Sequence, residues 1–225
     1  MKFSLLVFDW DGTLMDSEAR IVACVEAAVR DLEMPVPERE AISNIIGLGL
    51  REAVHQLFPE SDDQLHLQIA ARYRVHFFSG SEAPSQLFEG ARETLENLAD
   101  RGYMLAVATG KGRQGLDHAL KTTGLERFFH FTRCADETFS KPHPEMLNQI
   151  LEVSGTYPDQ ALMIGDTEYD LEMALNAGMP SLGVTYGVHT PERLRKHAPL
   201  ACVDRITEIP DWLDSYLEKT SSSNI

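Results

Sequence analysis

Two carboxylates separated by one residue, Asp9 and Asp11, directly follow a run of four apolar residues at positions 5–8. Such a run is typical of a strand buried on both faces, as in a parallel sheet. Carboxylates this close resist ionising together unless a cation offsets their charge. Mg²⁺ binds carboxylate oxygens, and Gly12 lets the backbone turn sharply beside an ion. The pair therefore indicates either a cation site or a capped strand end with an ordinary turn.

Three further polar residues follow the predicted strands or lie in the loops between them. Thr109 and Asp166 each come at the end of a predicted strand, and Lys141 lies in a connecting loop. Open α/β sheets bind their ligands beyond the carboxyl ends of the strands. We therefore expect these residues to converge with Asp9 and Asp11 on one site, although each taken alone has a purely structural reading.

This set of groups suits phosphoryl chemistry. Asp9 is the candidate nucleophile that attacks phosphorus, and Asp11 is the candidate general acid and base. Thr109 offers a hydroxyl, Gly110 a backbone N–H, and Lys141 a fixed positive charge to the phosphoryl oxygens. The residues thus predict catalysis by positioning and by electrostatic stabilisation.

Hydrophobic periodicity predicts the elements that position these groups. Expected strands cover residues 5–8, 103–109, 128–131, 161–165 and 181–185, and expected helices cover residues 91–101, 113–123, 144–154 and 211–217. A further helix is expected after the acidic loop at residues 166–170 and ends at Gly178. Strands alternating with helices imply right-handed crossovers and a parallel sheet covered on both faces. The expected core is a doubly wound, Rossmann-like α/β domain, with a disordered tail from Thr220.

Residues 17–85 have a different pattern from the rest of the chain. Their apolar residues recur at helical steps without strand-like alternation, and the segment ends in a loop-rich stretch from Gly80. We predict an all-helical cap at residues 17–85, inserted into a core formed by residues 1–16 and 86–225. Closure of such a cap would expel water and strengthen charge interactions in the site.

The net charge of −15 disfavours nucleic acids and anionic membranes as partners. A small anionic substrate needs only a local positive site. The three cysteines are widely spaced, which fits reduced thiols rather than a disulfide framework. No apolar leader and no 18-residue apolar run is present, so we expect a cytoplasmic protein. The sequence does not indicate the oligomeric state.

The polar stretches match a known family pattern. The segments Asp9-Trp10-Asp11-Gly12-Thr13-Leu14, Thr109, Lys141-Pro142 and Gly165-Asp166-Thr167-Glu168-Tyr169-Asp170 resemble the four ordered motifs of the haloacid dehalogenase (HAD) superfamily. The resemblance spans most of the chain and is closest to the subfamily with a helical cap, which includes phosphoglycolate phosphatases. It implies a Mg²⁺-dependent phosphomonoesterase that hydrolyses a small phosphorylated metabolite through an aspartyl-phosphate.

The same resemblance implies a role for each motif residue. Asp9 would be the nucleophile and Asp11 the acid/base. Mg²⁺ would be held by the Asp9 side chain, the Asp11 backbone carbonyl and Asp166, with Asp170 supporting the metal site. Lys141 would steady Asp9 and, with Thr109, bind the phosphoryl oxygens.

Two features fall outside the motifs or depart from them. The family commonly has Asn after the second-motif Thr, whereas this chain has Gly110, which keeps only the backbone contact. Arg51 lies in a glycine-rich loop and, by resemblance to cap loops, would bind a second anionic group, or it is a solvated residue at a helix start. Lys111 and Arg113 either face the substrate or are solvated charges, and we expect the second, because exposure is usual for such residues.

Three other functions remain open at this point. A phosphomutase shares every motif residue but keeps water from the aspartyl-phosphate. A 2-haloacid dehalogenase needs no cation, which leaves Asp11 and Asp166 unexplained. A receiver-type phospho-acceptor also carries Asp, Thr and Lys on a parallel sheet, but has no need of a helical insertion.

Overall fold

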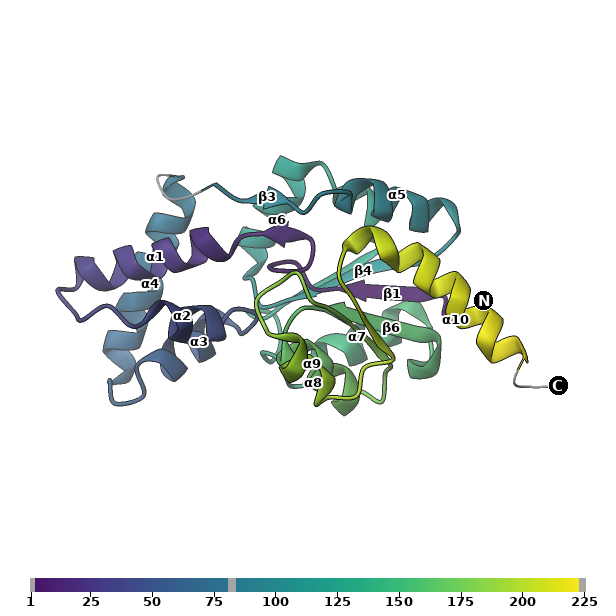
Figure 1. The fold of residues 1–225 in the computed structure, drawn as a ribbon. Coiled ribbons are helices and arrows are strands. Elements are labelled where there is room, and N and C mark those ends of the chain that lie inside the picture. Colours follow the sequence, from purple (N-terminus) through teal and green to yellow (C-terminus); the bar gives the residue numbers. More distant parts are fainter. Residues whose placement is uncertain (1–2, 81–83, 223–225) are drawn as a thin grey trace.

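The computed structural model describes residues 3–80 and 84–222 (Figure 1). Its main element is a six-stranded parallel sheet with the strand order β5-β4-β1-β6-β7-β8. The strands are β1 (Leu5–Phe8), β4 (Met104–Thr109), β5 (Phe131–Cys134), β6 (Ala161–Gly165), β7 (Ser181–Val184) and β8 (Ala201–Val203). The predicted doubly wound α/β fold is confirmed, and β1 lies at its centre.

Alternate residues of β1 enter two separate apolar layers, one on each face of the sheet. Leu6 and Phe8 belong to the larger layer, which is covered by α5 (Ala91–Asp100), α6 (Arg113–Thr123) and α10 (Ile209–Ser222). Leu5 and Val7 belong to the other layer, with α7 (Glu145–Ser154) and α8 (Glu168–Asn176). Because both faces are covered, a strand of four consecutive apolar residues is stable here.

Two expectations about the core elements were wrong, and one strand was missed. The strand expected at residues 128–131 begins only at Phe131, because the preceding residues form the 3₁₀ turn η1 (Glu126–Phe128). The edge strand β8 was not expected at all. The tail expected to be disordered from Thr220 is helical up to Ser222, and residues 223–225 lie outside the described residues.

Four consecutive helices follow β1 in the chain, before α5, and form what we call the helical lobe. These are α1 (Glu18–Asp31), α2 (Arg39–Asn44), α3 (Leu50–Leu57) and α4 (Asp63–Ser79). Apolar side chains of these helices form clusters of their own, distinct from the two layers on the sheet. In Figure 1 the lobe lies beyond the carboxyl ends of the central strands. The lobe therefore faces the edge of the sheet where ligands are expected.

The chain enters and leaves the lobe through a short antiparallel pair of strands, β2 (Met15–Asp16) and β3 (Gln86–Leu87). The pair holds the two connections side by side. Its position matches the ends predicted for the insertion, although the domain boundaries themselves stay a prediction. The remaining short elements are α9 (Pro191–Arg195) and the 3₁₀ turns η2 (Pro158–Gln160) and η3 (Ile206–Glu208).

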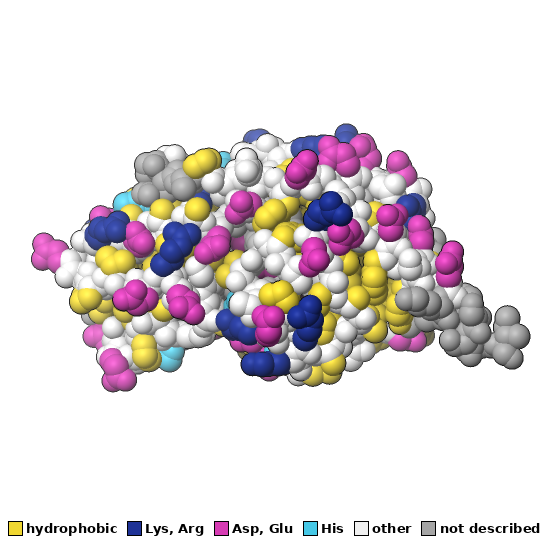
Figure 2. Space-filling model, in the orientation of Figure 1, with side chains coloured by type: hydrophobic (Ala, Val, Ile, Leu, Met, Phe, Trp, Pro, Cys, Tyr) yellow, Lys and Arg dark blue, Asp and Glu magenta, His cyan; other side chains and the backbone are white. Residues whose placement is uncertain are grey.

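Charged side chains of both signs are scattered over the displayed face of the molecule, and Figure 2 shows no continuous basic patch there. Among the residues that the structure describes, no helix has the length and apolar character required to cross a membrane.

Candidate active site

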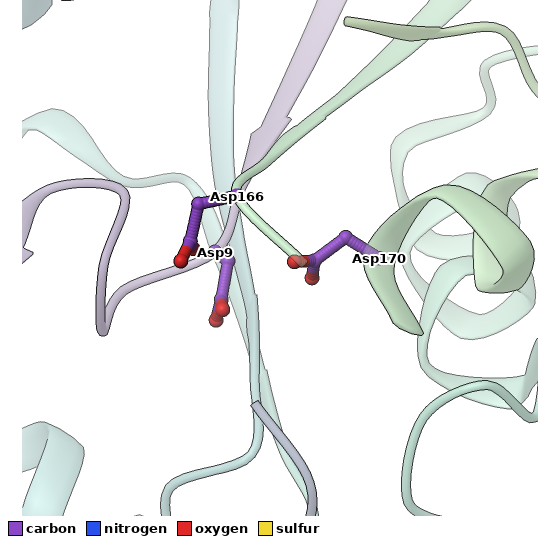
Figure 3. A group of neighbouring side chains, drawn as sticks. All are labelled: Asp9, Asp166 and Asp170. Atoms are coloured by element: carbon purple, nitrogen blue, oxygen red, sulfur yellow. The ribbon is translucent and has the colours of Figure 1, made fainter. Parts of the chain in front are cut away.

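The register of the sheet gathers the acids and the hydroxyl predicted from the sequence. Phe8 pairs with Val107 on one side and with Ile164 on the other. Asp9, one residue further on, therefore lies level with the ends of β4 and β6, which lead to Thr109 and Asp166. Figure 3 shows the carboxylates of Asp9 and Asp166 side by side, with that of Asp170 directed towards them from α8.

Asp9, Asp166 and Asp170 form one compact carboxylate cluster. Each offers an oxygen within 4.8 Å of the others, and all three residues are completely buried. Lys141 joins them from the loop before α7, with its Nζ atom 2.8 Å from Asp9 Oδ1 and 2.6 Å from Asp170 Oδ1. These residues thus lie together, as expected from the sequence. The single positive charge of Lys141 balances only part of the negative charge of the three carboxylates.

The imbalance affects the protonation of the cluster. Burial raises the pKa of Asp9 well above its usual value; Lys141 opposes this shift, and the charges of Asp170 and Asp166 add to it. Burial, together with Asp170, raises the pKa of Asp166 to about 7. For Lys141 burial acts to lower the pKa, but the charges of Asp170 and Asp9 outweigh it and raise the pKa. The cluster therefore favours an additional positive charge.

The donor set fits a hard divalent cation. Asp9 Oδ2 is buried and has no hydrogen-bonding partner among the residues that the structure describes. Asp166 is held in place by Thr13, whose Oγ1 donates to Oδ1 at 2.8 Å, and by the N–H of Val188, which donates to Oδ2 at 2.9 Å. Carboxylate oxygens at this spacing, one of them unpartnered, are suitable ligands for Mg²⁺.

Asp170 has a structural role in addition to its place in the cluster. Its Oδ2 accepts hydrogen bonds from the N–H and the hydroxyl of Thr167. Its own N–H donates to Thr167 Oγ1, which completes a capping box at the start of α8. Its Oδ1 pairs with Lys141. Because both oxygens are occupied, Asp170 is better placed to orient Lys141 and to support a metal indirectly than to bind it strongly.

Gly12 is required by the geometry around Asp166. Its φ is +79°, a conformation that disfavours side chains, and a Cβ there would lie 2.1 Å from Asp166 Oδ2. The turn formed by Asp9, Asp11 and Gly12 thus packs directly against the carboxylate of Asp166. The glycine that the sequence suggested for a sharp turn also makes room for this carboxylate.

The Asp11 side chain lies outside the carboxylate cluster and has partners of its own. Ser17 Oγ donates to Asp11 Oδ1 at 2.5 Å, and Lys111 Nζ lies 2.8 Å from Asp11 Oδ2. The expectation that Asp11 contributes a metal ligand concerned its backbone carbonyl, which these contacts leave untouched. Its side chain is thereby separated from that of Asp9, as two distinct chemical roles require.

The expectation that Lys111 is a solvated charge was wrong. Its side chain is only 9% exposed, because it is held between Asp11 and the ring of Phe77 on α4, whose centroid lies 4.8 Å from Nζ. Arg113 also has partners: it forms ion pairs with Asp117 and Glu137 on the surface of the α/β core. Sequence reasoning missed Lys111 because the residue that buries it lies 34 positions earlier in the chain.

Gly110 lies against the loop at residues 45–49, which joins α2 to α3 in the helical lobe. A Cβ at this position would come 2.4 Å from the Gly47 carbonyl oxygen and 2.5 Å from that of Leu48. The same loop is tied to the core by Gly49, whose N–H donates to Ser140 Oγ at 2.7 Å. The absence of the usual Asn side chain therefore allows the loop to lie directly on the strand end.

These groups open into a cavity of about 420 Å³ between the core and the lobe. From the core it is lined by Asp9, Asp11, Thr109, Gly110 and Lys111. Arg51 also lines it, as an exposed residue at the start of α3. Lys141, Asp166 and Asp170 lie behind Asp9 and shape its surroundings.

A parallel α/β sheet with a buried acidic centre at its carboxyl edge is an arrangement suited to a cation-assisted hydrolase. A family model described as haloacid dehalogenase-like hydrolase matches residues 6–184. The chain belongs to this family, which confirms the resemblance seen in the motifs.

Named relatives are similar over nearly the whole length. A protein of Dickeya dadantii named "Probable phosphatase IndB" is 37% identical over 97% of this chain and 96% of its own. A phosphoglycolate phosphatase of Aliivibrio fischeri is 34% identical over 87% of this chain and 89% of its own. The crystal structure of a predicted phosphoglycolate phosphatase from Haemophilus somnus superposes with a TM-score of 0.83 at 26% identity, covering 95% and 99% of the two chains.

Proposed function

We propose that this protein is a Mg²⁺-dependent phosphomonoesterase acting on a small phosphorylated metabolite. The observation that carries the proposal is Asp9: fully buried, paired with Lys141 through one oxygen, and unpartnered at the other, in the wall of a cavity. The family and its phosphatase-named relatives point the same way.

The proposed reaction has two transfers. A carboxylate oxygen of Asp9 attacks phosphorus, the bond from phosphorus to the ester oxygen breaks, and the Asp11 carboxyl gives its proton to the departing alkoxide. Water then attacks the aspartyl-phosphate, passing a proton to Asp11, and the bond between phosphorus and the Asp9 oxygen breaks. Inorganic phosphate leaves and Asp9 is restored.

Other residues of the site hold the phosphoryl group. We assign Thr109 Oγ1, the backbone N–H of Gly110 and Lys141 Nζ to its oxygens, where the positive charge of Lys141 offsets charge developing in the transition state. We assign Mg²⁺ to Asp9, Asp166 and the Asp11 carbonyl, with Asp170 in support. When bound, the ion supplies positive charge to the reacting oxygens.

The helical lobe is proposed to act as a cap over this chemistry. Several contacts join it to the core: Gly49 to Ser140, and Tyr169 Oη to the Asn44 carbonyl at 2.9 Å. With these contacts formed, the lobe would exclude bulk water while the phosphoryl group is transferred to Asp9. With its acidic net charge and reduced-thiol composition, the protein is proposed to act in the cytoplasm without nucleic acid or membrane partners.

A panel of phosphorylated metabolites tests the proposal by the release of inorganic phosphate from purified protein. We expect multiple turnovers with Mg²⁺ and none with EDTA, with recovery when Mg²⁺ is added back. Free phosphate from a single substrate would count against a phosphomutase, and cation dependence against a dehalogenase. One stable phosphate per chain without turnover would contradict the proposal.

A further inference from the structure

The cavity over Asp9 has two chemically different ends. Its floor, supplied by the core, carries the acids, the Thr109 hydroxyl and Lys111. Its far end, supplied by three helices of the lobe, is apolar and aromatic. The side chains that form this apolar end are Val25, Val54, Leu57, Ile69 and Tyr73, and the Phe77 ring lies between it and Lys111 of the floor.

The apolar end is a wall rather than an exposed surface. Val25, Val54 and Ile69 are only 6%, 4% and 2% exposed, respectively. Burial raises the pKa of Tyr73 well above its usual value, so that its phenol is neutral throughout the physiological range. Charged lining residues of the lobe, such as Arg51 and Arg74, are instead exposed. A ligand that reaches the wall therefore leaves water for a mainly apolar environment, which the charges of Arg20, Lys111 and Asp11 approach on the side of Phe77 and Tyr73.

The size of the cavity excludes a packing defect. Protein interiors leave few voids larger than a water molecule. A volume of about 420 Å³ lies within the range of pockets that bury whole organic ligands, and it is continuous with the candidate nucleophile. The alcohol part of a two-carbon phosphate ester would leave most of this apolar space unfilled.

We propose that the substrate is a phosphomonoester of a bulky, mainly apolar alcohol, whose phosphate contacts the core and whose body fills the apolar end of the cavity. This inference rests on the proposed phosphatase function. It makes the apolar residues of α1, α3 and α4 the specificity-determining groups, and it disfavours small polar acids such as phosphoglycolate as the preferred substrate.

A series of n-alkyl phosphates from ethyl to hexyl tests the proposal, since these esters share the same type of leaving group and differ in apolar length. We expect kcat/KM to rise by roughly tenfold or more from ethyl to hexyl, because added methylenes are favourable only in an apolar pocket. Hexyl phosphate should also exceed phosphoglycolate by a similar factor.

A matched pair of variants locates the effect. The double variant Val25→Thr/Val54→Thr keeps the side-chain shapes but adds two hydroxyls to the wall, and it should lower the hexyl-to-ethyl ratio by roughly threefold or more. Val29→Thr, one turn further along α1, changes a residue that is equally buried but outside the lining, and should leave the ratio unchanged.

Binding gives a second readout that needs no turnover. Hexylphosphonate, which cannot be hydrolysed, should raise the unfolding temperature of the Mg²⁺-loaded protein more than ethylphosphonate at equal concentration. If no ester releases phosphate, the proposed function is wrong. If phosphate is released but kcat/KM is flat or falls with chain length, the function stands and the apolar substrate is refuted.

Discussion

Asp9 is buried next to two other carboxylates, and this environment is unfavourable for its charge until a cation binds. We expect Asp9→Asn to remove turnover, by roughly a thousandfold or more, because an amide is a poor nucleophile. In EDTA at pH 8, the same change should raise the free energy of unfolding by about 1 kcal/mol, because one buried charge is removed. An Asn can still accept from Lys141 through its oxygen.

Thermal unfolding in EDTA and a phosphate-release assay check both halves of this prediction. Asp214→Asn makes the same change at an exposed residue on the surface and is the control. It should change neither the turnover rate nor the unfolding temperature much. Retained activity in Asp9→Asn would remove Asp9 from the role of nucleophile. A less stable metal-free variant would mean that the carboxylate is held favourably by its neighbours.

Lys111 and Arg113 offer a comparison between two cations that look alike in the sequence. Lys111 contacts Asp11 and Phe77, whereas Arg113 pairs with acids outside the cavity. We expect Lys111→Met to lower kcat/KM at least about tenfold with little loss of stability, because Asp11 loses its charged neighbour. Arg113→Met should instead reduce stability by about 1 kcal/mol and spare activity. Equal effects of the two changes on kcat/KM would contradict this assignment.

Among the elements, the loop at residues 45–49 determines how closely the lobe approaches the strand ends. Gly110→Asn introduces the residue that the family commonly has, yet its Cβ would collide with two backbone carbonyls of that loop. Backbone cannot move aside as a side-chain tip can, so the loop must retreat. We expect kcat/KM to fall by roughly tenfold.

Gly155→Asn is the matched control for this change. Gly155 ends α7 in a left-handed conformation that Asn tolerates, a Cβ there meets nothing within 4 Å, and the residue lies outside the cavity lining. Its replacement should leave kcat/KM unaltered and lower the free energy of unfolding by at most about 1 kcal/mol. A Gly110→Asn variant as active as the original protein would show that the loop does not need this close approach.

The elements that carry chemistry were the most predictable from sequence. The strands β1, β4 and β6 are almost entirely apolar runs, and a polar residue lies at the end of β4 (Thr109) or directly after the strand (Asp9, Asp166). Both features are local in the sequence. β8 was missed because it is a short edge strand, only partly buried at Ala201 and Cys202. β5 was placed too early because aromatic residues at 128 and 129 suggest a strand while forming a turn.

The parts of the candidate site that lie at the strand ends or in the motif loops could be predicted, because the signal for them is local in the sequence. Asp9, Asp166 and Lys141 follow from the order of the motifs. The burial of Lys111 under Phe77 and the approach of the loop to Gly110 depend on how the lobe meets the core. No pattern near either residue carries that information, so only the three-dimensional arrangement reveals it.

For the whole molecule, the stability should respond to pH and to Mg²⁺ together. The folded state holds the pKa of Asp166 at about 7, above the value of 3.8 expected when unfolded, so the folded state binds the extra proton. The contribution of Asp166 to the free energy of unfolding of the metal-free protein is therefore greatest below pH 3.8, and it is lost as the pH rises towards 7. His189 has a lowered pKa, mainly through burial, and acts in the opposite direction near pH 6.

Comparing the unfolding temperature with and without Mg²⁺ separates the pH effect of the carboxylates from that of His189, because only the carboxylates are expected to bind the ion. Since the ion requires ionised carboxylates, protons compete with it at low pH. We expect the rise in unfolding temperature caused by Mg²⁺ to be small near pH 5 and to grow up to about pH 8. A rise that is the same at both values would mean that Mg²⁺ does not bind at this cluster.

The most direct test of the account is to trap the phosphoryl group on Asp9. In Asp11→Asn, p-nitrophenyl phosphate can still transfer its phosphoryl group, because nitrophenolate leaves without a proton, but no base remains to activate water. We expect one nitrophenolate released per chain with Mg²⁺, then a stall, and borohydride reduction followed by peptide mapping should find homoserine at position 9. Continuous turnover without a burst, or reduction at any other aspartate, would contradict the proposal.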